Sequence, residues 1–421
     1  MGFFRRQVVT AALTANAVRP IPGFRTGIPA FFAGWLTGEL APHALAVTAA
    51  DTAVHLAHPP AGGRSRAGLA LSAVSTAGLA YLVAQSRRVR ELTEEVLEEA
   101  LGADYVEQLD ALPTPSDLAV PWRQLVNPFR SRATGYQVER DIAYNAHGRR
   151  GYLDVYTPEG GVPRGGAPVL LQVHGGAWTI GNKDQQGLPL MRHLAAKGWV
   201  CVAINYRLAP RDPFPAQVID VKQAIAWIKE HIADYGGDPG YVAITGGSAG
   251  GHLAALAALT PGDKDWQPGF EDADTSVQVA APHYGVYDMA GSTGLRPATL
   301  MRDRFLAPRI MQKRWSEDPE LFEAASPILR ITDDAPDFFV LHGSHDTLVP
   351  VEQARLFVER LRATTRRTVV YAELPGAQHA FDIFPSIRSS HVLRAIDRYL
   401  HWHWAGHRAR TGKADAGAAR D

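Results

Sequence analysis

The chain contains 421 residues, more than a single compact domain usually needs, so one large domain with an appendage is expected. Lys plus Arg and Asp plus Glu both number 43, which gives a formal net charge of zero. This balance removes the basic footprint that nucleic-acid binding requires, so no nucleic-acid partner is expected. The only cysteine is Cys201, which excludes an intrachain disulfide and leaves the redox compartment open.

Residues 1–112 are predicted to form an apolar, helical N-terminal region that serves as a membrane anchor or a cap. Within this region, residues 67–86 contain no charged side chain. Five arginines bracket the run: Arg64, Arg66, Arg87, Arg88 and Arg90. Twenty uncharged residues can cross ~30 Å of hydrocarbon as a helix. The serines, threonine, glutamine and glycines of the run are equally compatible with a helix hairpin packed on the rest of the protein.

Residues 28–50 form a second and weaker apolar run, because Glu39 and His43 interrupt it. This run could pair with residues 67–86 as a hairpin, so residues 28–86 are the predicted region of membrane association. Arginines flank the stronger run on both sides, so the positive-inside rule gives no orientation. The short, polar stretch at the extreme N-terminus does not make a convincing cleavable signal peptide. Localisation, membrane-associated or cytoplasmic, stays open.

Residues 88–101 repeat apolar positions at helical spacing, which predicts a charged amphipathic helix ending at Gly102. Two prolines, Pro113 and Pro115, follow and break the chain. Residues 113–135 are therefore predicted to be a linker.

The next part, residues 136–404, alternates between strand-like and helix-like segments. Its central strand candidates are nearly continuous apolar runs, as is typical of parallel strands buried on both faces. The alternation predicts a doubly wound α/β sheet. The strand candidates are residues 136–143, 152–156, 169–173, 200–205, 241–245, 277–283, 338–341 and 368–374. Residues 287–325 break the pattern and could contribute a lid, and residues 405–421 are predicted to be a disordered tail.

The strand at residues 169–173 runs into His174-Gly175-Gly176-Ala177-Trp178. Glycines after a strand let backbone N–H groups approach a ligand closely. Gly175 and Gly176 are therefore predicted to donate hydrogen bonds to an oxyanion, with the N–H group of Ala249 as a third donor. A plain glycine turn is the alternative, and the position of this loop at a strand end disfavours it.

A second loop follows the strand at residues 241–245, which leads through Gly246-Gly247-Ser248-Ala249-Gly250 into a run of helix formers. In this setting the Gly-x-Ser-x-Gly pattern places the serine on a tight strand-to-helix turn. The hydroxyl is then exposed, and the N-terminus of the following helix favours developing negative charge. Ser248 is therefore predicted to be a nucleophile.

A serine hydroxyl needs a base to take its proton, and a carboxylate must orient that base. Downstream of Ser248, Asp346 lies just past the strand at residues 338–341. His379 lies on the loop that follows the strand at residues 368–374. His379 is predicted to be the base and Asp346 the acid, although Asp346 could instead cap the next helix.

Other histidines are expected to have structural roles. His252 lies four residues past Ser248 on the following helix and should face the packing around the turn. His342 and His345 should shape the loop that carries Asp346. No metal or organic cofactor is expected, because no dinucleotide-binding glycine fingerprint follows the strands and the predicted triad needs none.

With these residues located, the chain resembles the α/β-hydrolase esterases of the hormone-sensitive-lipase type. It is also similar to the feruloyl/acetyl-xylan esterase and kynurenine formamidase groups. The resemblance covers residues 136–404 and rests on motifs in the expected order: His174-Gly175-Gly176-Ala177-Trp178, Asn205-Tyr206-Arg207-Leu208-Ala209-Pro210, Phe214-Pro215-Ala216, residues 246–251, Asp346 and His379.

Two departures favour the feruloyl-esterase and formamidase groups. Gly247 stands where the hormone-sensitive-lipase pattern usually has an acidic residue, and Ala177 replaces the third glycine of its glycine triplet. The N-terminal region lies outside this resemblance, although a long hydrophobic leader is similar to that of actinobacterial Lip-type carboxylesterases.

The resemblance implies an α/β-hydrolase fold with a mostly parallel, eight-stranded sheet and helices on both faces. It also implies a serine carboxylesterase or lipase-like hydrolase that cleaves a small-molecule ester or a lipid through an acyl-enzyme. Two alternatives remain, an amide or formamide hydrolase with the same triad and a non-catalytic binding protein with this fold. Acyl-chain length, ester or amide preference and oligomeric state are left open.

Overall fold

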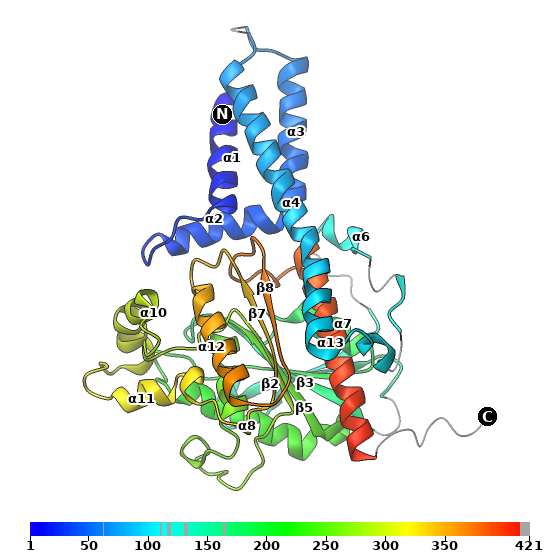
Figure 1. Cartoon of the computed structure of the whole chain (residues 1–421), viewed down its shortest axis with the longest axis vertical. Coiled ribbons are helices and arrows are strands. Elements are labelled where there is room, and N and C mark those ends of the chain that lie inside the picture. The colour runs from blue at the N-terminus through cyan, green and yellow to red at the C-terminus, as the bar shows by residue number, and fades with distance from the viewer. Residues whose placement is uncertain (62, 110–111, 116–118, 130–133, 163–165, 413–421) are drawn as a thin grey trace, which may run out of the picture.

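A computed structural model describes the whole chain except residues 62, 110–111, 116–118, 130–133, 163–165 and 413–421. Its main body is an eight-stranded sheet covered by helices, and an upright group of N-terminal helices stands on one end of this body (Figure 1). The strands are β1 (Tyr136–Ala143), β2 (Tyr152–Pro158), β3 (Ala167–Val173), β4 (Val200–Ile204), β5 (Gly237–Gly247), β6 (Val279–His283), β7 (Asp337–Gly343) and β8 (Val369–Leu374).

The strand order is β1-β2-β4-β3-β5-β6-β7-β8. β2 pairs antiparallel with both β1 and β4, and every pairing from β4 through β3 to β8 is parallel. All residues of β3, β4 and β6 are buried, as expected for parallel strands covered on both faces. All eight predicted strands are present, and the expected doubly wound α/β sheet is confirmed.

Helices cover both faces of the sheet and enclose two apolar cores. One core contains side chains from α8 (Ala216–His231), α9 (Ala249–Leu259) and α12 (Val351–Thr364). The other contains side chains from α7 (Leu188–Ala196) and α13 (Ile387–Thr411). The irregular stretch after β6 contains α10 (Arg296–Met301), a π-helical segment (Arg302–Met311) and α11 (Pro319–Ala324).

The strand register brings the carboxyl ends of the central strands to one edge. Val173 of β3 pairs with Gly246 of β5, and Gly247 pairs with His283 at the end of β6. At the other side, Gly343 of β7 pairs with Leu374 of β8. The loops that leave these strands therefore lie side by side, where ligands usually bind to open α/β sheets.

The N-terminal region contains α1 (Phe3–Val18), α2 (Gly27–Glu39), α3 (Ala41–Ala57) and α4 (Arg66–Leu101). α1, α3 and the first part of α4 stand together away from the body, and α2 lies across their base (Figure 1). The expectation of one apolar span over residues 28–50 is wrong, because the chain turns at Leu40, just before Pro42 at the start of α3. α3 is the helix that packs against α4 as a hairpin.

Two boundaries in the sequence interpretation need correction. The predicted linker at residues 113–135 contains a short helix, α6 (Trp122–Leu125), and seven of its residues lie outside the described part of the chain. The tail predicted at residues 405–421 is helical to Thr411, because Trp404 stacks on His407 and lies under the Arg408 guanidinium. Residues 413–421 lie outside the described residues.

Candidate active site

Ser248 lies at the sharp turn between β5 and α9. Its backbone has φ 59° and ψ −122°, a strained conformation for a residue with a side chain, and its own N–H group donates to the His283 carbonyl at 3.0 Å. A Cβ atom at Gly246 would lie 2.5 Å from the carbonyl oxygen of Val173, so the turn needs glycine there. Ser248 is half-buried and sits at the N-terminus of α9, where the helix dipole favours negative charge.

Asp346 and His379 form a short hydrogen-bonded pair. The Nδ1 atom of His379 lies 2.6 Å from Oδ2 of Asp346, and both side chains are almost fully buried. The other oxygen of Asp346 accepts hydrogen bonds from the backbone N–H groups of Leu348 and Val349, each at 2.8 Å. Asp346 is therefore held as an acceptor with its second oxygen directed at the imidazole.

The charge state of Asp346 follows from its surroundings. Burial alone would raise the pKa of this carboxyl, but His379 and His342 beside it hold the pKa well below its usual range. His342 is completely buried, and its Nε2 atom is 3.3 Å from Asp346 and 2.9 Å from the Val349 carbonyl. His342 thus supports the loop that carries Asp346, in the structural role expected from the sequence.

Gln378 joins the two loops that carry this pair. Its side-chain oxygen accepts hydrogen bonds from the backbone N–H groups of Thr347 and His379, both at 3.0 Å. Thr347 follows Asp346 and His379 follows Gln378, so one amide sets the spacing of both loops. The separation between Asp346 and His379 is therefore held by backbone contacts as well as by their own hydrogen bond.

The loop after β3 packs directly against the serine turn. A Cβ atom at Gly175 would lie 2.6 Å from the Gly247 carbonyl oxygen and 3.3 Å from the Cβ atom of Ser248. The N–H group of Gly175 donates to Oε1 of Gln186 at 2.8 Å. Gly175 can therefore donate to an oxyanion only if Gln186 releases it.

The next two residues of this loop differ from Gly175. Within the described chain, no hydrogen bond is found for the N–H group of Gly176 or of Ala177. Ala177 and Trp178 both have positive φ angles, 52° and 57°, so the turn is tight here as well. His174 is buried beneath the loop and stacks on Tyr206, whose hydroxyl donates to the His174 carbonyl at 2.8 Å.

His252 faces the packing around the turn, as expected. It accepts a hydrogen bond at Nδ1 from the Trp178 indole N–H at 3.1 Å, and its Nε2 lies 2.8 Å from the Ala325 carbonyl. Burial lowers its pKa to about 4. A neutral imidazole with both nitrogens engaged in this way has a structural role, because neither nitrogen is available to a serine.

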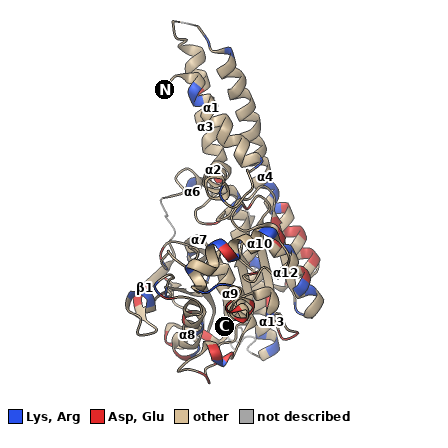
Figure 2. Cartoon of the chain, turned by 90° about the vertical axis from the view of Figure 1, so that its left-hand side faces the viewer, with Lys and Arg blue, Asp and Glu red and all other residues tan. Residues whose placement is uncertain are grey.

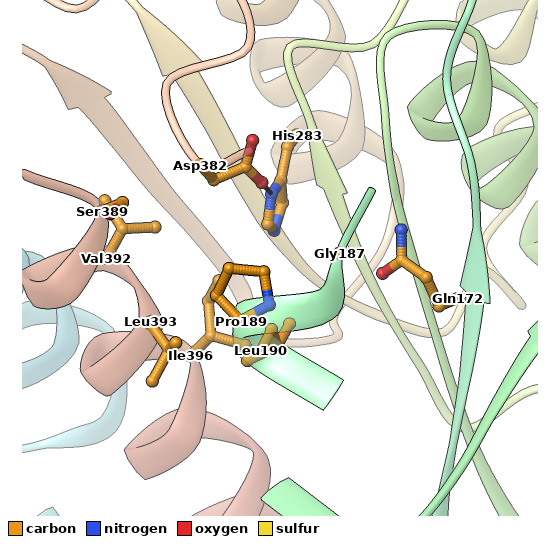
Figure 3. A pocket seen from close by; sticks show the side chains of 10 residues that line it. All are labelled: Gln172, Gly187, Pro189, Leu190, His283, Asp382, Ser389, Val392, Leu393 and Ile396. Carbon is orange, nitrogen blue, oxygen red and sulfur yellow. Dashed lines mark hydrogen bonds and ion pairs between the residues drawn. The ribbon is translucent and has the colours of Figure 1, made fainter. Parts of the chain in front are cut away.

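A second histidine–carboxylate pair, which the sequence interpretation missed, lies beside the serine turn. His283 Nδ1 is 2.6 Å from Asp382 Oδ2, and the two side chains point toward each other from the end of β6 and from the loop between β8 and α13 (Figure 3). The Tyr284 hydroxyl donates to the other oxygen of Asp382. The position of His283 at the end of a predicted strand was the only signal for this pair, and nothing local pointed to Asp382.

Tyr284 connects this pair to the predicted triad. Its ring centroid lies 4.5 Å from that of His379, and a Cβ atom at Gly247 would lie 2.5 Å from its hydroxyl oxygen. The space beside Gly247 is thus filled by a tyrosine bound to Asp382. Because Tyr284 contacts both the serine turn and His379, these two parts of the site are separated by the width of one side chain.

The cavity beside His283 is small. Its volume is about 20 Å³, and its walls include Gln172, Pro189, Leu190 and residues of α13 (Figure 3). This space suits a single water molecule and not a substrate. Among the described residues, no hydrogen-bond partner is found for Nε2 of His283.

Comparisons with known proteins support the fold and the enzyme class. The family model BD-FAE matches residues 153–361. The chain is 42% identical to the probable carboxylic ester hydrolase LipM of Mycobacterium tuberculosis (strain ATCC 25618 / H37Rv), over 93% of this chain and 91% of the relative. Esterase LipQ of the same organism is 45% identical over 75% of each chain.

A solved structure of an inhibited esterase B from Lactobacillus rhamnosis has a TM-score of 0.57 and 18% identity, covering 70% of this chain and 94% of that chain. This likeness shows the fold, and the long matches to the mycobacterial proteins show the family. The protein is therefore a member of the carboxylic ester hydrolase family with the α/β-hydrolase fold.

Proposed function

We propose that this carboxylic ester hydrolase acts through a triad of Ser248, His379 and Asp346. The observation that carries the proposal is the buried 2.6 Å pair of His379 and Asp346, on loops beside the strained serine turn. Chain order supports it, since the α/β-hydrolase sequence is serine, acid, then histidine.

In the proposed reaction, Nε2 of His379 takes the proton of the Ser248 hydroxyl while the serine oxygen attacks the ester carbonyl carbon. The tetrahedral intermediate collapses, the carbon–alkoxide bond breaks, and His379 returns the proton to the leaving alcohol. Water then attacks the acyl-serine by the reverse proton path and releases the acid. Asp346 stays ionised throughout, which fits its lowered pKa, and stabilises the imidazolium ion.

For the oxyanion hole, Gly175, Gly176 and Ala249 remain the candidates. Ala249 is the first residue of α9, and Gly176 has an N–H group with no partner among the described residues. The N–H group of Gly175 already donates to Gln186, so Gly175 is a weaker candidate donor to the oxyanion than Gly176 or Ala249. We propose that Gly176 and Ala249 donate first and that Ala177, also unpartnered within the described chain, takes the third position.

Active-site labelling tests the triad directly. The full chain should react with a fluorophosphonate probe at Ser248, and Ser248→Ala should lose both labelling and hydrolysis of p-nitrophenyl esters. Folded wild-type protein that turns over esters without labelling at Ser248 would disprove the proposal.

The main alternative is an amide or formamide hydrolase with the same residues. Gly247 keeps this alternative open. The hormone-sensitive-lipase pattern has an acidic residue at this position, whereas here Tyr284 fills the space beside a glycine. Rates measured on p-nitrophenyl esters and on N-formyl aromatic amines separate the two activities. A protein that binds esters without hydrolysing them would instead favour the non-catalytic reading.

We also propose that the N-terminal region associates with a membrane, as predicted for residues 28–86. α4 is long and apolar enough to cross a bilayer, and only 28% of its most apolar stretch is buried. The α1–α3–α4 bundle has an inverted surface, with large apolar side chains exposed: Phe4, Val8, Val9, Leu13, Val47, Val54, Leu56 and Val74. Polar residues fill much of its interior: Gln7, Thr14, Thr48, His55, Ser72 and Ser75.

Such a surface is stable in lipid and unfavourable in water, because lipid removes the cost of exposing apolar side chains. Inside the bundle, polar side chains bind one another, as in the 2.6 Å contact between Thr52 and Ser72. Asp51, the one acidic residue of α1, α3 and residues 66–86 of α4, pairs with Arg6 at 2.6 Å. Paired charges and internal hydrogen bonds are what a bilayer requires of polar groups.

A further inference from the structure

Arginines mark both ends of the apolar bundle. Arg5, Arg64 and Arg66 are exposed at the end far from the body, and Arg87, Arg88 and Arg90 are exposed where α4 enters the body. Between these two levels, the ribbon of the bundle in Figure 2 carries no residues coloured as charged. The twenty residues between Arg66 and Arg87 span ~30 Å as a helix, which is the thickness of the hydrocarbon core.

Helix α2 lies at the level of the second arginine group, across the base of the bundle (Figure 1). Its outer face carries Ile28, Phe32 and Leu36, which are 58%, 54% and 40% exposed and repeat every four residues. Near α6, Phe129 is 70% exposed, and its ring lies 5.2 Å from that of the buried Phe384, which Trp35 of α2 contacts at 5.4 Å. An apolar strip with aromatic and arginine neighbours fits the interfacial zone of a bilayer.

The inner face of α2 touches the loops of the proposed triad. The ring of Phe31 meets the imidazole of His379 edge-on, with centroids 5.9 Å apart. The Thr347 hydroxyl, next to Asp346, donates to the Gly27 carbonyl at 2.9 Å. The hydroxyl also accepts a hydrogen bond from the Gln378 side chain at 3.1 Å. α2 is therefore bound to the residues that set the spacing of His379 and Asp346.

The far end of α2 is fixed by a buried ion pair. The Glu39 carboxylate binds the Arg388 guanidinium and accepts a hydrogen bond from the Ser386 hydroxyl at 2.6 Å, and all three residues are almost fully buried. Ser386 and Arg388 begin α13, a few residues after His379. A buried pair of this kind is costly to break, because one partner would remain charged and unpaired. α2 thus behaves as part of the catalytic body.

We infer that α2 is an interfacial helix whose outer face contacts lipid and whose inner face forms part of the catalytic site, so that the enzyme takes esters held in a lipid bilayer. This inference rests on the proposed triad and adds the source of the substrate and a positioning role for Phe31. α2 contacts Thr347 through the Gly27 carbonyl and His379 through the ring of Phe31, so α2 itself helps to position His379 and Asp346.

The first test locates α2. Cys201 is completely buried, so a single added cysteine can be labelled selectively in the full chain. Ile28→Cys, Val54→Cys and Leu329→Cys each receive a fluorophore, and the protein is reconstituted into vesicles of phosphatidylcholine and phosphatidylglycerol. Brominated lipids should quench the labels at positions 28 and 54 but not the label at 329, which lies on the catalytic body.

Failure of lipid to quench position 28 while it quenches position 54 would overturn the interfacial placement of α2. Absence of quenching at both positions would overturn it too and would point to a second copy of the chain as the cover. Ser248 labelling by the fluorophosphonate is measured on the same samples. A chain that is quenched as expected but never labelled would disprove the triad and leave the placement intact.

The second test addresses the contact with His379. Phe31→Ala should lower kcat on soluble p-nitrophenyl acetate by about tenfold with little change in KM, because the imidazole loses its packed neighbour. Phe31→Leu should restore most of kcat. Ile28→Ser, on the opposite face, should leave acetate turnover unchanged and reduce the rate on a long-chain ester dissolved in the vesicles. Equal acetate rates for wild type and Phe31→Ala would overturn the positioning role.

Discussion

The catalytic body and the N-terminal bundle place their apolar residues in opposite ways. In the body, side chains such as Leu171, Ile244 and Phe338 are completely buried, and charged residues are scattered over the outer helices and loops (Figure 2). In the bundle, Val47 and Val74 are each 68% exposed, and Ser75 is completely buried. The same rule explains both arrangements when the body is surrounded by water and the bundle by lipid. The exposed apolar residues of the bundle therefore support the proposal that lipid surrounds it.

Ester hydrolysis should depend on the triad in the catalytic body. The substitution with the largest expected effect, Ser248→Ala, tests this assignment. Ser248→Ala should lower kcat by about 10⁴-fold or more, because it removes the nucleophile of the proposed triad. The same substitution should leave membrane partition unchanged, which a sedimentation assay of vesicle-bound protein measures. A variant that keeps most of its ester turnover would contradict the assignment of Ser248.

A substitution in the bundle tests whether its exposed side chains face lipid or water. Val74→Asp should cost about 2.5–3.5 kcal/mol if the side chain faces hydrocarbon, which corresponds to roughly a hundredfold loss of vesicle partition. In water an exposed site of this kind changes stability by no more than about 0.5 kcal/mol. Leu329→Asp, also on an exposed apolar residue but on the body, is the matched control. Equal partition of both variants would show that the bundle faces water.

A smaller effect is expected from the second histidine–carboxylate pair. Asp382→Asn weakens the bonds from His283 and Tyr284, so Tyr284 should pack less firmly against His379. We expect kcat to fall by about tenfold with KM nearly unchanged, as for a lost transition-state alignment. Asp334→Asn, at an exposed turn, is the control, and steady-state kinetics on p-nitrophenyl butyrate give both values. A fall in both variants would point to a general loss of fold.

The smallest expected effect concerns pH and the interior of the body. Burial lowers the pKa of His252 to about 4, below the value of about 6.5 for an unfolded histidine. The unfolded chain then binds more protons between these values, so the free energy of unfolding should fall as the pH drops from about 6.5 to about 4. For His252 alone, we expect the free energy of unfolding to fall by about 1–3 kcal/mol over this pH range.

Thermal unfolding midpoints measured across this pH range check the sign. His252→Gln should be less stable at neutral pH, because its bonds to Trp178 and Ala325 are weakened, but its midpoint should change less with pH. His174, whose burial also lowers its pKa to about 4, should retain part of the pH dependence. An unchanged pH dependence in His252→Gln would rule out this residue as its source.

Much of the body could be predicted from the sequence because its signals are local. Continuous apolar runs mark buried parallel strands, and the Gly-x-Ser-x-Gly pattern between a strand and a run of helix formers marks the turn at Ser248. The positions of Asp346 and His379 after their strands follow from the same rule, since strand ends in a parallel sheet meet at one edge. The sequence by itself thus determined the sheet, the order of the candidate triad residues and an apolar N-terminus.

Only the tertiary structure decided which distant residues meet at that edge. Glu39 binds Arg388 across nearly the whole chain, Asp382 binds Tyr284 from the loop between β8 and α13, and Phe31 of α2 contacts His379. Such contacts depend on how loops close and how helices pack, and no periodicity or motif encodes them. The direction in which the apolar side chains of the bundle face was equally hidden, because the same apolar residues suit a buried protein core and an exposed surface.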